Sequence, residues 1–137
     1  MKPCRECQRE VSEQAFACPG CGAPFPAKPR WDGWGYEYVS KARIGSLPLL
    51  HISFKFRANR RPVVARGVFA IGQFAVGIVT ISQFGVGVFS LSQFTLAGWA
   101  ISQFGVAWAF VVTQFGICWA DGRGQFVIKL AELLGWR

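Results

Sequence analysis

Four cysteines near the start of the chain form two pairs with the spacing of metal ligands. The first pair is Cys4-x-x-Cys7, the second is Cys18-x-x-Cys21, and ten residues separate the pairs. The turn within each pair aims two thiolates at one point, so the two pairs can complete a tetrahedral shell around one ion. Four thiolates leave no open coordination position, which predicts a structural zinc site rather than a catalytic one. Two disulfides or a redox-active dithiol are the alternatives.

The segment that must position these cysteines is short. About 20 residues cannot bury a stable core, so metal binding would supply most of the folding free energy here. The run Cys18-Pro19-Gly20-Cys21-Gly22 resembles the knuckle of zinc ribbons, and residues 4–24 are similar to the small ribbons at the termini of many prokaryotic proteins. Gln8 stands where that family often has Gly. Zinc thiolates imply a reducing compartment, and the polar N-terminus is unlike a signal peptide, so we expect a cytoplasmic ribbon.

Residues suited to acid–base or nucleophilic catalysis are missing from the longest segment of the chain. Residues 67–120 include no Asp, Glu, His, Lys or Arg over 54 positions. His51, the only histidine, lies beside alternating strand positions and is expected to be a hydrogen-bonded structural residue. We therefore expect that the protein is not an enzyme.

The uncharged segment is also periodic. The dipeptide Gln-Phe recurs at intervals of ten and then eleven residues, and a small, a large apolar and an aliphatic residue each return every five positions. One extra residue near Phe110 shifts the register. A fixed period indicates a fold built by stacking one small unit. The Gln-Phe pairs begin at Gln73, Gln83, Gln93, Gln103, Gln114 and Gln125.

A strand explains this period better than a helix does. At 100° per residue, a ten-residue repeat would carry the Gln positions around a helix. Two membrane helices of about 20 residues would fit the length, but no charged or Pro-marked loop would separate them. Small–x–large alternation instead places Ser82 and Phe84 on one face of a strand. Cys118 falls on a small position and is expected to be buried.

Residues 67–117 resemble pentapeptide-repeat proteins in this small/large pair. The coils of that family are four-sided, with the small and the large residue both pointing inward. The resemblance implies that Phe84 and its equivalents fill the core, while aliphatic residues such as Ile81 point outward. The chain departs from the family in having Gln where Asp or Asn usually precedes the large residue, and in having aliphatic outward positions that are usually Gly or polar.

The glutamines have two possible roles. In stacked four-sided coils about 4.8 Å apart, they would form two ladders of hydrogen-bonded amides on opposite sides. The alternative is a polar lining for a pore or groove. In the ladder, Gln73 aligns with Gln93 and lies near Gln114, while Gln83 aligns with Gln103.

The excess positive charge lies just before the repeat. Residues 28–66 hold nine Lys or Arg against two acidic residues, a net +7 of the chain's +8. Such residues next to a membrane contact anionic lipid head groups at about 1 kcal/mol each, whereas nucleic-acid phosphates are the competing partner. The neighbouring uncharged segment favours the membrane. The residues expected to contact head groups are Lys41, Arg43, Lys55, Arg57, Arg60, Arg61 and Arg66.

The domain organisation predicted from these patterns is all-β. The run from Trp34 to Ile52, followed by hydrophobic repeats, looks like an uncharacterised group of bacterial zinc-ribbon proteins and carries no known activity. An amphipathic helix over 125–136 would cap the open edge of the coil, with Trp136 as an interfacial anchor. The predicted parts are a zinc ribbon (1–27), a linker (28–33), an irregular basic first coil (34–66), a four-sided parallel β-helix or β-solenoid (67–121), and a turn with the helix (122–137).

A stacked coil satisfies its backbone groups internally, as lipid requires. We therefore expect a non-enzymatic, membrane-embedded β-helix with a cytoplasmic zinc ribbon, acting as a scaffold or interaction module. Four-sided coils would reach only about 20 Å, short of the roughly 30 Å hydrocarbon core, so we also expect a homo-oligomer. The alternatives are a soluble self-assembling scaffold or fibre and, less favoured, a nucleic-acid-binding zinc-ribbon protein. No small-molecule substrate is evident.

Overall fold

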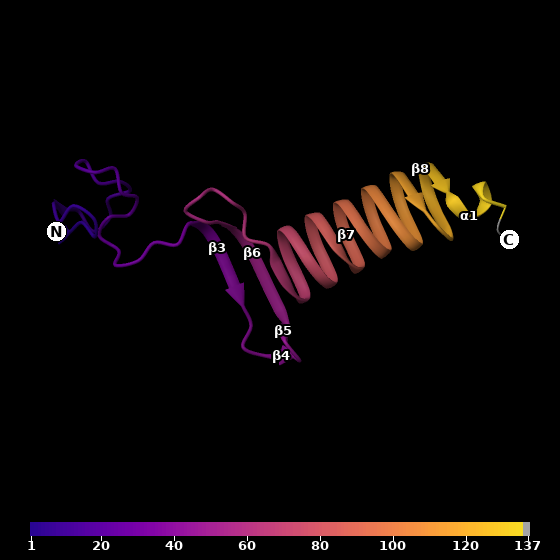
Figure 1. Cartoon of the computed structure of the whole chain (residues 1–137), viewed down its shortest axis with the longest axis horizontal. Helices are drawn as coiled ribbons and strands as arrows, with labels where there is room; N and C mark the ends of the chain where they lie inside the picture. The colour runs from indigo at the N-terminus through magenta and orange to yellow at the C-terminus, as the bar shows by residue number, and fades with distance from the viewer. Residues whose placement is uncertain (136–137) are drawn as a thin grey trace.

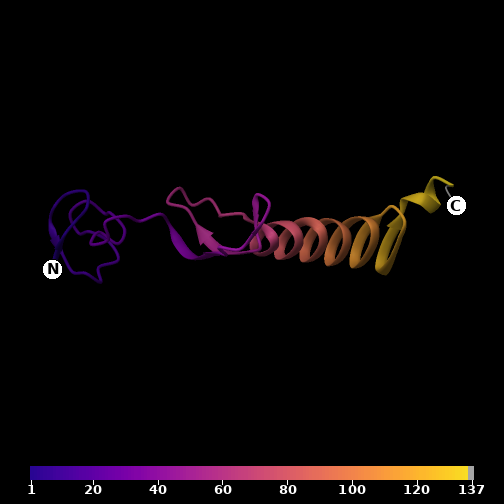
Figure 2. The same ribbon diagram turned by 90° about the horizontal axis from the view of Figure 1, so that it is seen from below.

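The computed structural model describes residues 1–135, and most of them lie in strands. A cysteine-rich segment comes first, a hairpin follows, and a long coil with a short terminal helix completes the chain (Figure 1). Hairpin and coil follow one another along one axis (Figure 2). An all-β fold with a small C-terminal helix is thus confirmed. In chain order the elements are β1 (Lys2–Pro3), β2 (Glu10–Val11), β3 (Trp34–Val39), β4 (Arg43–Ile44), β5 (Leu47–Pro48), β6 (Leu50–Phe56), β7 (Ala65–Cys118), β8 (Asp121–Lys129) and α1 (Leu130–Leu133).

One sheet runs through the hairpin and the coil in the order β3-β6-β7-β8. β3 and β6 are antiparallel, while β6 pairs in parallel with the start of β7, and the end of β7 pairs in parallel with β8. β4 and β5 form a small antiparallel pair at the tip of the hairpin. The hairpin therefore provides the first layer on which the coil is stacked.

β7 is one continuous strand that winds into stacked turns (Figure 1). The rings of Phe74 and Phe84 stack at 5.0 Å between centroids, as do those of Phe84 and Phe94. Because residues ten apart are neighbours, one turn takes ten residues. In the predicted four-sided coil a turn takes twenty residues, and Phe74 and Phe84 would lie on opposite sides. That prediction is wrong.

The interior of the coil holds mainly small side chains, and no aromatic side chain of residues 67–118 is fully buried. The first and third residues of each five-residue unit, such as Ala70 and Gly72, point inward; from Ala70 to Gly105 the first residues are buried, and the third residues are buried or half-buried. Ten extended residues span at most about 33 Å, so one turn can enclose only a thin layer of side chains. The prediction that phenylalanines fill the interior is therefore wrong: Phe84 is 45% exposed and Phe94 is 44% exposed.

Hydroxyl groups inside the coil bond to one another from turn to turn. Thr80 donates to Ser90 (2.9 Å), and Ser92 bonds to both Ser82 (3.0 Å) and Ser90 (2.8 Å). A Cβ added at Gly85 would lie 2.3 Å from Ser92 Oγ. The interior at this level is filled by these groups and leaves no channel, so a pore lined by the glutamines does not pass through it.

The extra residue in the repeat shifts the buried positions as predicted. After Ala107, the next buried positions are Val111 and Thr113, so one unit has six residues. Cys118 lies five residues after Thr113, at the third position of the next unit, and is fully buried, which confirms its predicted place. The eleven-residue spacing continues in the register of β7 with β8, where Phe115 lies beside Phe126.

The C-terminal segment forms one more turn of the coil instead of a long helix. The predicted turn at 121–124 and helix from 125 are wrong as far as residue 129, because these residues pair in parallel with β7. The pairing partners outweigh the amphipathic pattern of the segment, since strand addition satisfies the edge of the last full turn. Within residues 121–135 only α1 is helical, and it contacts β8. Trp136, the predicted interfacial anchor, lies outside the described residues.

Candidate functional site: a cysteine cluster and an apolar coil surface

The four N-terminal cysteines converge as their spacing predicts. Their sulfur atoms all lie within 4.8 Å of one another, with Cys4 Sγ 3.7 Å from Cys21 Sγ and Cys7 Sγ 3.5 Å from Cys18 Sγ. A tetrahedral zinc with Zn–S bonds near 2.3 Å sets its sulfurs about 3.8 Å apart, which these distances match. All four are free thiols, and 3.5 Å is far longer than a disulfide bond. The cluster has the arrangement of a zinc-ribbon-like metal site.

The two knuckles that carry the cysteines have the same backbone hydrogen bonds. In each, the first cysteine donates its N–H to the carbonyl five residues later, at 2.8 and 2.9 Å. It accepts the N–H four residues later, at 3.0 and 2.8 Å. That fourth residue adopts a positive φ, +75° at Gly22 and +61° at Gln8. Gln8 thus holds a left-handed conformation that costs a side-chain-bearing residue roughly 1–2 kcal/mol.

The thiol pKa values explain why such a cluster needs a cation. The backbone N–H groups of Cys21 and Gly20 donate toward Cys18 Sγ and lower the pKa of Cys18 to about 6. The N–H of Ala23 acts in the same direction on Cys21, but burial and the neighbouring sulfurs outweigh it and raise the pKa of Cys21 to about 12. Sulfurs this close cannot all be anionic by themselves, whereas a divalent ion among them stabilises four thiolates.

Arg5 holds the two knuckles together and was not identified from the sequence. Its Nη1 donates to the carbonyls of Pro24 (2.8 Å) and Phe25 (3.0 Å), and its backbone N–H donates to Pro26 (3.0 Å). Arg5 thereby joins the first knuckle to the chain that leaves the second. The position lies between the cysteines of the first pair, where the CxxC pattern accepts any residue, so no sequence signal marks it.

Aromatic contacts connect the cysteine-rich segment to the hairpin. The ring of Phe25 packs against Phe16 (5.6 Å) and Trp34 (5.0 Å), and Trp34 packs against Trp31 (5.2 Å). Lys28 Nζ lies 4.9 Å above the Phe25 ring. The predicted linker 28–33 is therefore part of a packed aromatic cluster, which connects the cysteine-rich segment to β3.

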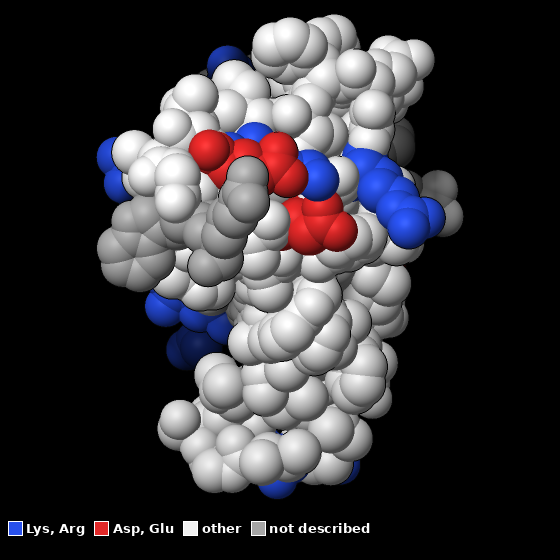
Figure 3. Space-filling model, turned by 90° about the vertical axis from the view of Figure 1, so that its right-hand side faces the viewer, with Lys and Arg blue, Asp and Glu red and all other residues white. Residues whose placement is uncertain are grey.

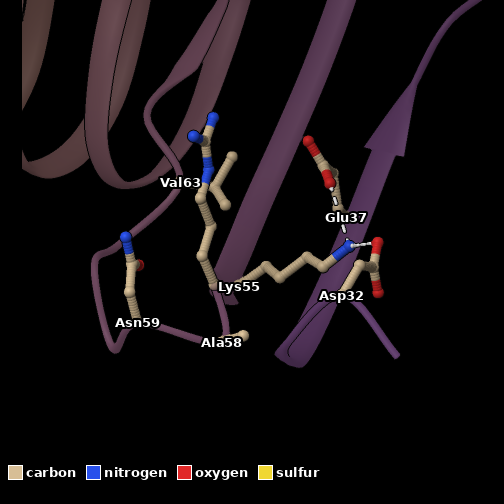
Figure 4. Close-up of a pocket in the computed structure, with 7 residues that line it drawn as sticks. Asp32, Glu37, Lys55, Ala58, Asn59 and Val63 are labelled. Atoms are coloured by element: carbon tan, nitrogen blue, oxygen red, sulfur yellow. Dashed lines mark hydrogen bonds and ion pairs between the residues drawn. The ribbon is translucent and has the colours of Figure 1, made fainter. Parts of the chain in front are cut away.

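A polar network lies on the hairpin beside a cavity of about 410 Å³. Lys55 Nζ reaches between Asp32 and Glu37, with which it forms ion pairs (Figure 4). Glu37 also accepts a hydrogen bond from His51 Nε2 (3.3 Å), and His51 Nδ1 accepts the backbone N–H of Arg66 (2.9 Å). His51 is a hydrogen-bonded structural residue, as expected. The hydrogen bond to Lys55 lowers the pKa of Asp32, and the same bond raises the pKa of Lys55.

The residues predicted to contact head groups divide into three sets. The Lys55 side chain is 13% exposed and already paired, so it is not free for an external partner. Lys41 and Arg43 are exposed at the tip of the hairpin near β4. The loop after β6 lies at the edge opposite the hairpin tip (Figure 1), and Arg66 lies on the first turn of the coil. Basic groups therefore flank the N-terminal end of the coil on two sides. The exposed residues of that loop are Arg57, Arg60 and Arg61.

The glutamines of the repeat lie in one column on the outside of the coil. Each directly precedes a member of the Phe74–Phe84–Phe94 ring stack, and a ten-residue turn places them all on the same edge. Two ladders on opposite sides are therefore excluded, while amide-to-amide bonding within the single column remains a prediction. The residues of this column are Gln73, Gln83, Gln93, Gln103 and Gln114.

The outer surface of the coil is apolar between two charged ends. Residues 67–120 are uncharged, and their large side chains point outward and are partly exposed. At the C-terminal end, Lys129 pairs with Asp121 (2.7 Å) and with Glu132 (3.4 Å). Viewed from that end, the acidic atoms lie together with basic atoms beside them, further basic atoms lie around the rim, and most of the remaining surface is uncharged (Figure 3).

Two grooves run along the coil on opposite edges, half a turn apart. The Phe84 groove lies between the Phe74–Phe84–Phe94 stack, with its continuation to Phe115, and an aliphatic column that includes Val86. Two cavities of about 360 and 460 Å³ occupy it. The Trp99 groove lies between the Phe89–Trp99 stack and the column of Ile81, Leu91 and Ile101, with a cavity of about 460 Å³.

Comparison with known proteins leaves the identity to be argued from the site itself. No known protein family, curated protein or solved structure matches the chain. Among residues 1–135, no helix has both the length and the apolar character needed to cross a bilayer.

Proposed function

We propose that the protein is a non-enzymatic membrane scaffold: a β-solenoid of ten-residue turns embedded in the bilayer, with a structural zinc ribbon on the cytoplasmic side. The observation that carries this proposal is the distribution of charge. The coil is uncharged over residues 67–120, its large apolar side chains point outward, and charged residues resume at both ends. An apolar surface of this extent requires an apolar partner.

The length of the coil supports an arrangement across the bilayer. At ten or eleven residues per turn, 54 residues make about five turns, and at about 4.8 Å per turn they rise about 25 Å. The hydrocarbon core is about 30 Å thick. A four-sided coil would rise about half as far for the same residues, so the ten-residue turn reduces the predicted shortfall to about 5 Å.

The polar groups of the coil also suit a lipid environment. Parallel pairing between turns satisfies the backbone, and the inward hydroxyls bond to one another or to carbonyls, as Thr95 does to Gly85 O (3.1 Å). The outward amides are the exception, because an unpaired amide in hydrocarbon costs several kcal/mol. Among residues 1–135 no hydrogen bond joins these amides in the structure, so we propose that in lipid each glutamine side chain of the column turns to donate to the next.

The cysteine cluster stabilises the cytoplasmic end in this proposal. The sulfur separations match a tetrahedral zinc, and the four ligands leave no position for a substrate, so the ion's role is structural. A reduced zinc site belongs in a reducing compartment, which places the ribbon and the basic loops on the cytoplasmic face.

Membrane fractionation of two matched triple variants tests the proposal. Lysines at the exposed coil positions Ile81, Leu91 and Ile101 should move the full chain from the carbonate-resistant membrane fraction to the soluble or aggregated fraction. Each lysine at the bilayer centre costs roughly 3 kcal/mol. The control introduces three lysines at exposed apolar residues of the hairpin and should remain in the membrane. Release of the unmodified chain by carbonate, or an equal response of the two variants, would contradict embedding. The control positions are Tyr36, Ile44 and Leu47.

A second candidate is a soluble scaffold in which coils pack side by side. The exposed ring stacks favour it, because aromatic columns with a regular spacing could interdigitate with those of another copy. Association between copies thus belongs to both candidates, although the membrane candidate now depends on it less, because a single coil comes within about 5 Å of the thickness of the hydrocarbon core. Carbonate washing separates the two, since a peripheral assembly is released and an embedded one is retained.

A further inference from the structure

Each groove on the coil has a basic loop at its N-terminal end. The Phe84 groove begins at Val64, which lines its first cavity and follows Arg61 by three residues, a span of at most about 10 Å. The Trp99 groove lies below Phe69, whose N–H donates to Leu49 O (2.9 Å) beside the β4–β5 tip. That tip carries Lys41 and Arg43. The two grooves therefore have the same two parts: apolar walls along the coil and cations at the N-terminal end, which we call the mouth of the groove.

We propose that each groove binds one acyl chain of an anionic phospholipid, with the lipid phosphate held by the basic loop at its mouth. This inference rests on the proposed membrane function and names the ligand of the coil surface. Acyl chains lie along the bilayer normal, which is also the direction of the coil axis in an embedded chain. The first cavity of the Phe84 groove extends over about three turns, from Val64 to Leu96. Three turns rise about 15 Å, the depth of one leaflet.

The loop at the mouth of the Phe84 groove is shaped in advance for a phosphate. Arg57 donates its backbone N–H to Arg61 O (2.8 Å), and the Arg61 N–H is bonded to Asn59 Oδ1 (3.2 Å). The ion pairs within residues 1–135 include none of the guanidinium groups of Arg57, Arg60 and Arg61, and all three residues are exposed. Guanidinium groups bind phosphate oxygens through paired, charge-assisted hydrogen bonds, so a fixed turn with three of them suits one head group.

Charge complementarity favours a lipid over a second copy in the grooves. Two embedded copies share one orientation, so side-by-side packing would bring identical basic loops to the same level of the membrane. Like charges at that level repel one another. An anionic lipid has an apolar chain below a negative head group. The chain matches the apolar walls of the groove, and the head group matches the cations at its N-terminal end.

The test counts lipids that stay bound to the full-length zinc-loaded chain. The chain is reconstituted in vesicles of equal phosphatidylglycerol and phosphatidylcholine, extracted in mild detergent and measured by native mass spectrometry. Two retained phosphatidylglycerol molecules are expected. In the charge variant Arg60→Gln/Arg61→Gln, phosphatidylglycerol should fall to one, because each lost cation weakens binding roughly fivefold. Arg30→Gln/Arg123→Gln, which removes two exposed charges elsewhere, should retain two.

A groove-filling pair tests the acyl chain independently of charge. Val76→Trp/Val86→Trp places indoles in the Phe84 groove at positions 43% and 46% exposed. Ile78→Trp/Val88→Trp makes the same change at two positions, each 43% exposed, outside the groove walls. The first variant should retain one phosphatidylglycerol and the second should retain two. Because all four positions are exposed, neither variant should disturb folding, and far-ultraviolet circular dichroism checks this.

The outcomes separate the inference from the proposed function. If the chain resists carbonate but retains no phosphatidylglycerol in preference to phosphatidylcholine, the lipid site is refuted and the membrane function stands. If the groove-filling pair and its control lose lipid equally, the groove is not the site. A lipid-free dimer that Val76→Trp/Val86→Trp dissociates would assign the groove to a second copy. Failure of the unmodified chain to remain in vesicles would refute both.

Discussion

Replacing Gly85 by alanine tests which side chains fill the coil. In the structure this glycine points inward, and an added Cβ would lie 2.3 Å from Ser92 Oγ, 2.7 Å from Ser90 Oγ and 2.8 Å from Ser82 Oγ. In the predicted coil filled by phenylalanines, the same position lies between the inward Phe84 and the outward Val86 and not in the interior, so a methyl group there would be harmless. The two arrangements therefore predict opposite responses to one methyl group.

The cost of the methyl group follows from the hydrogen-bonded hydroxyl groups inside the coil. The three serines could rotate away, but Ser92 would then lose its bonds to Ser82 (3.0 Å) and Ser90 (2.8 Å). An overpacked core costs about 1–3 kcal/mol, and a buried hydroxyl without a partner costs a similar amount. We expect Gly85→Ala to lower the free energy of unfolding by about 2–3 kcal/mol.

The matched control is Gly98→Ala on the outside of the same coil. A Cβ at Gly98 would meet only backbone and Cα atoms of Val88, the nearest being the carbonyl oxygen at 3.1 Å. Loss of glycine's freedom in the unfolded chain stabilises by about 0.4–1 kcal/mol, which offsets that close contact, so the change should be near neutral. Adding Ser92→Ala to Gly85→Ala removes the closest obstacle and should recover part of the loss.

Urea unfolding of the full chain in detergent micelles, followed by circular dichroism, measures these differences. The reasoning requires Gly85→Ala to be less stable than Gly98→Ala by more than about 1 kcal/mol, the smallest cost expected of overpacking. Equal stabilities, or a gain from Gly85→Ala, would refute an interior of small side chains and restore the phenylalanine-filled coil.

Three further predictions concern the cysteine cluster and the hairpin. Gln8→Gly should relieve the positive φ and stabilise the metal-bound ribbon by about 1 kcal/mol, seen as slower zinc loss to a chelator. Arg5→Ala should destabilise the ribbon by about 2–4 kcal/mol through two lost charge-assisted bonds to carbonyls, with faster zinc loss, whereas Arg9→Ala should not. Because the pKa of Asp32 is lowered, its stabilisation is present above about pH 4 and is lost as acid protonates it below that. Because the pKa of Lys55 is raised, the stabilisation that Lys55 contributes is present below about pH 10 and is lost as the pH rises through its folded pKa. Lys55→Met should therefore flatten the acid and the alkaline limb of a pH–Tm curve.

The parts of the structure that short-range rules determine were predictable from the sequence. The paired CxxC motifs located the cysteine cluster, because the geometry of a knuckle depends on a few consecutive residues. The all-β fold, the buried Cys118 and the register shift after Phe110 followed from the five-residue period. Each of these inferences needs only neighbours along the chain or a repeat that returns to the same place.

The parts that depend on contacts between distant segments were not predictable. Arg5 binds carbonyls 19 and 20 residues away, and Lys55 pairs with a carboxylate 23 residues earlier. Residues 125–129 have the pattern of an amphipathic helix, yet they extend the sheet because the last turn of β7 offers them an edge. In each case a partner remote in sequence decides the outcome, and no local pattern identifies that partner.

The choice between ten and twenty residues per turn is different, because a sequence signal for it existed. A five-residue period fits both coils. The inward set of a four-sided coil should alternate small and large, whereas the four inward columns of this coil consist almost entirely of small residues; examples are Ala75, Gly85 and Thr95 in one column and Gly77, Gly87 and Ala97 in another. Columns of small residues leave no large residue for the interior, so the turn must be narrow and every phenylalanine must face outward. Because the aromatic side chains lie on the surface, they form the ring stacks and make the outer surface of the coil apolar. The narrow turn and the need for an apolar environment are therefore consequences of the same columns of small residues.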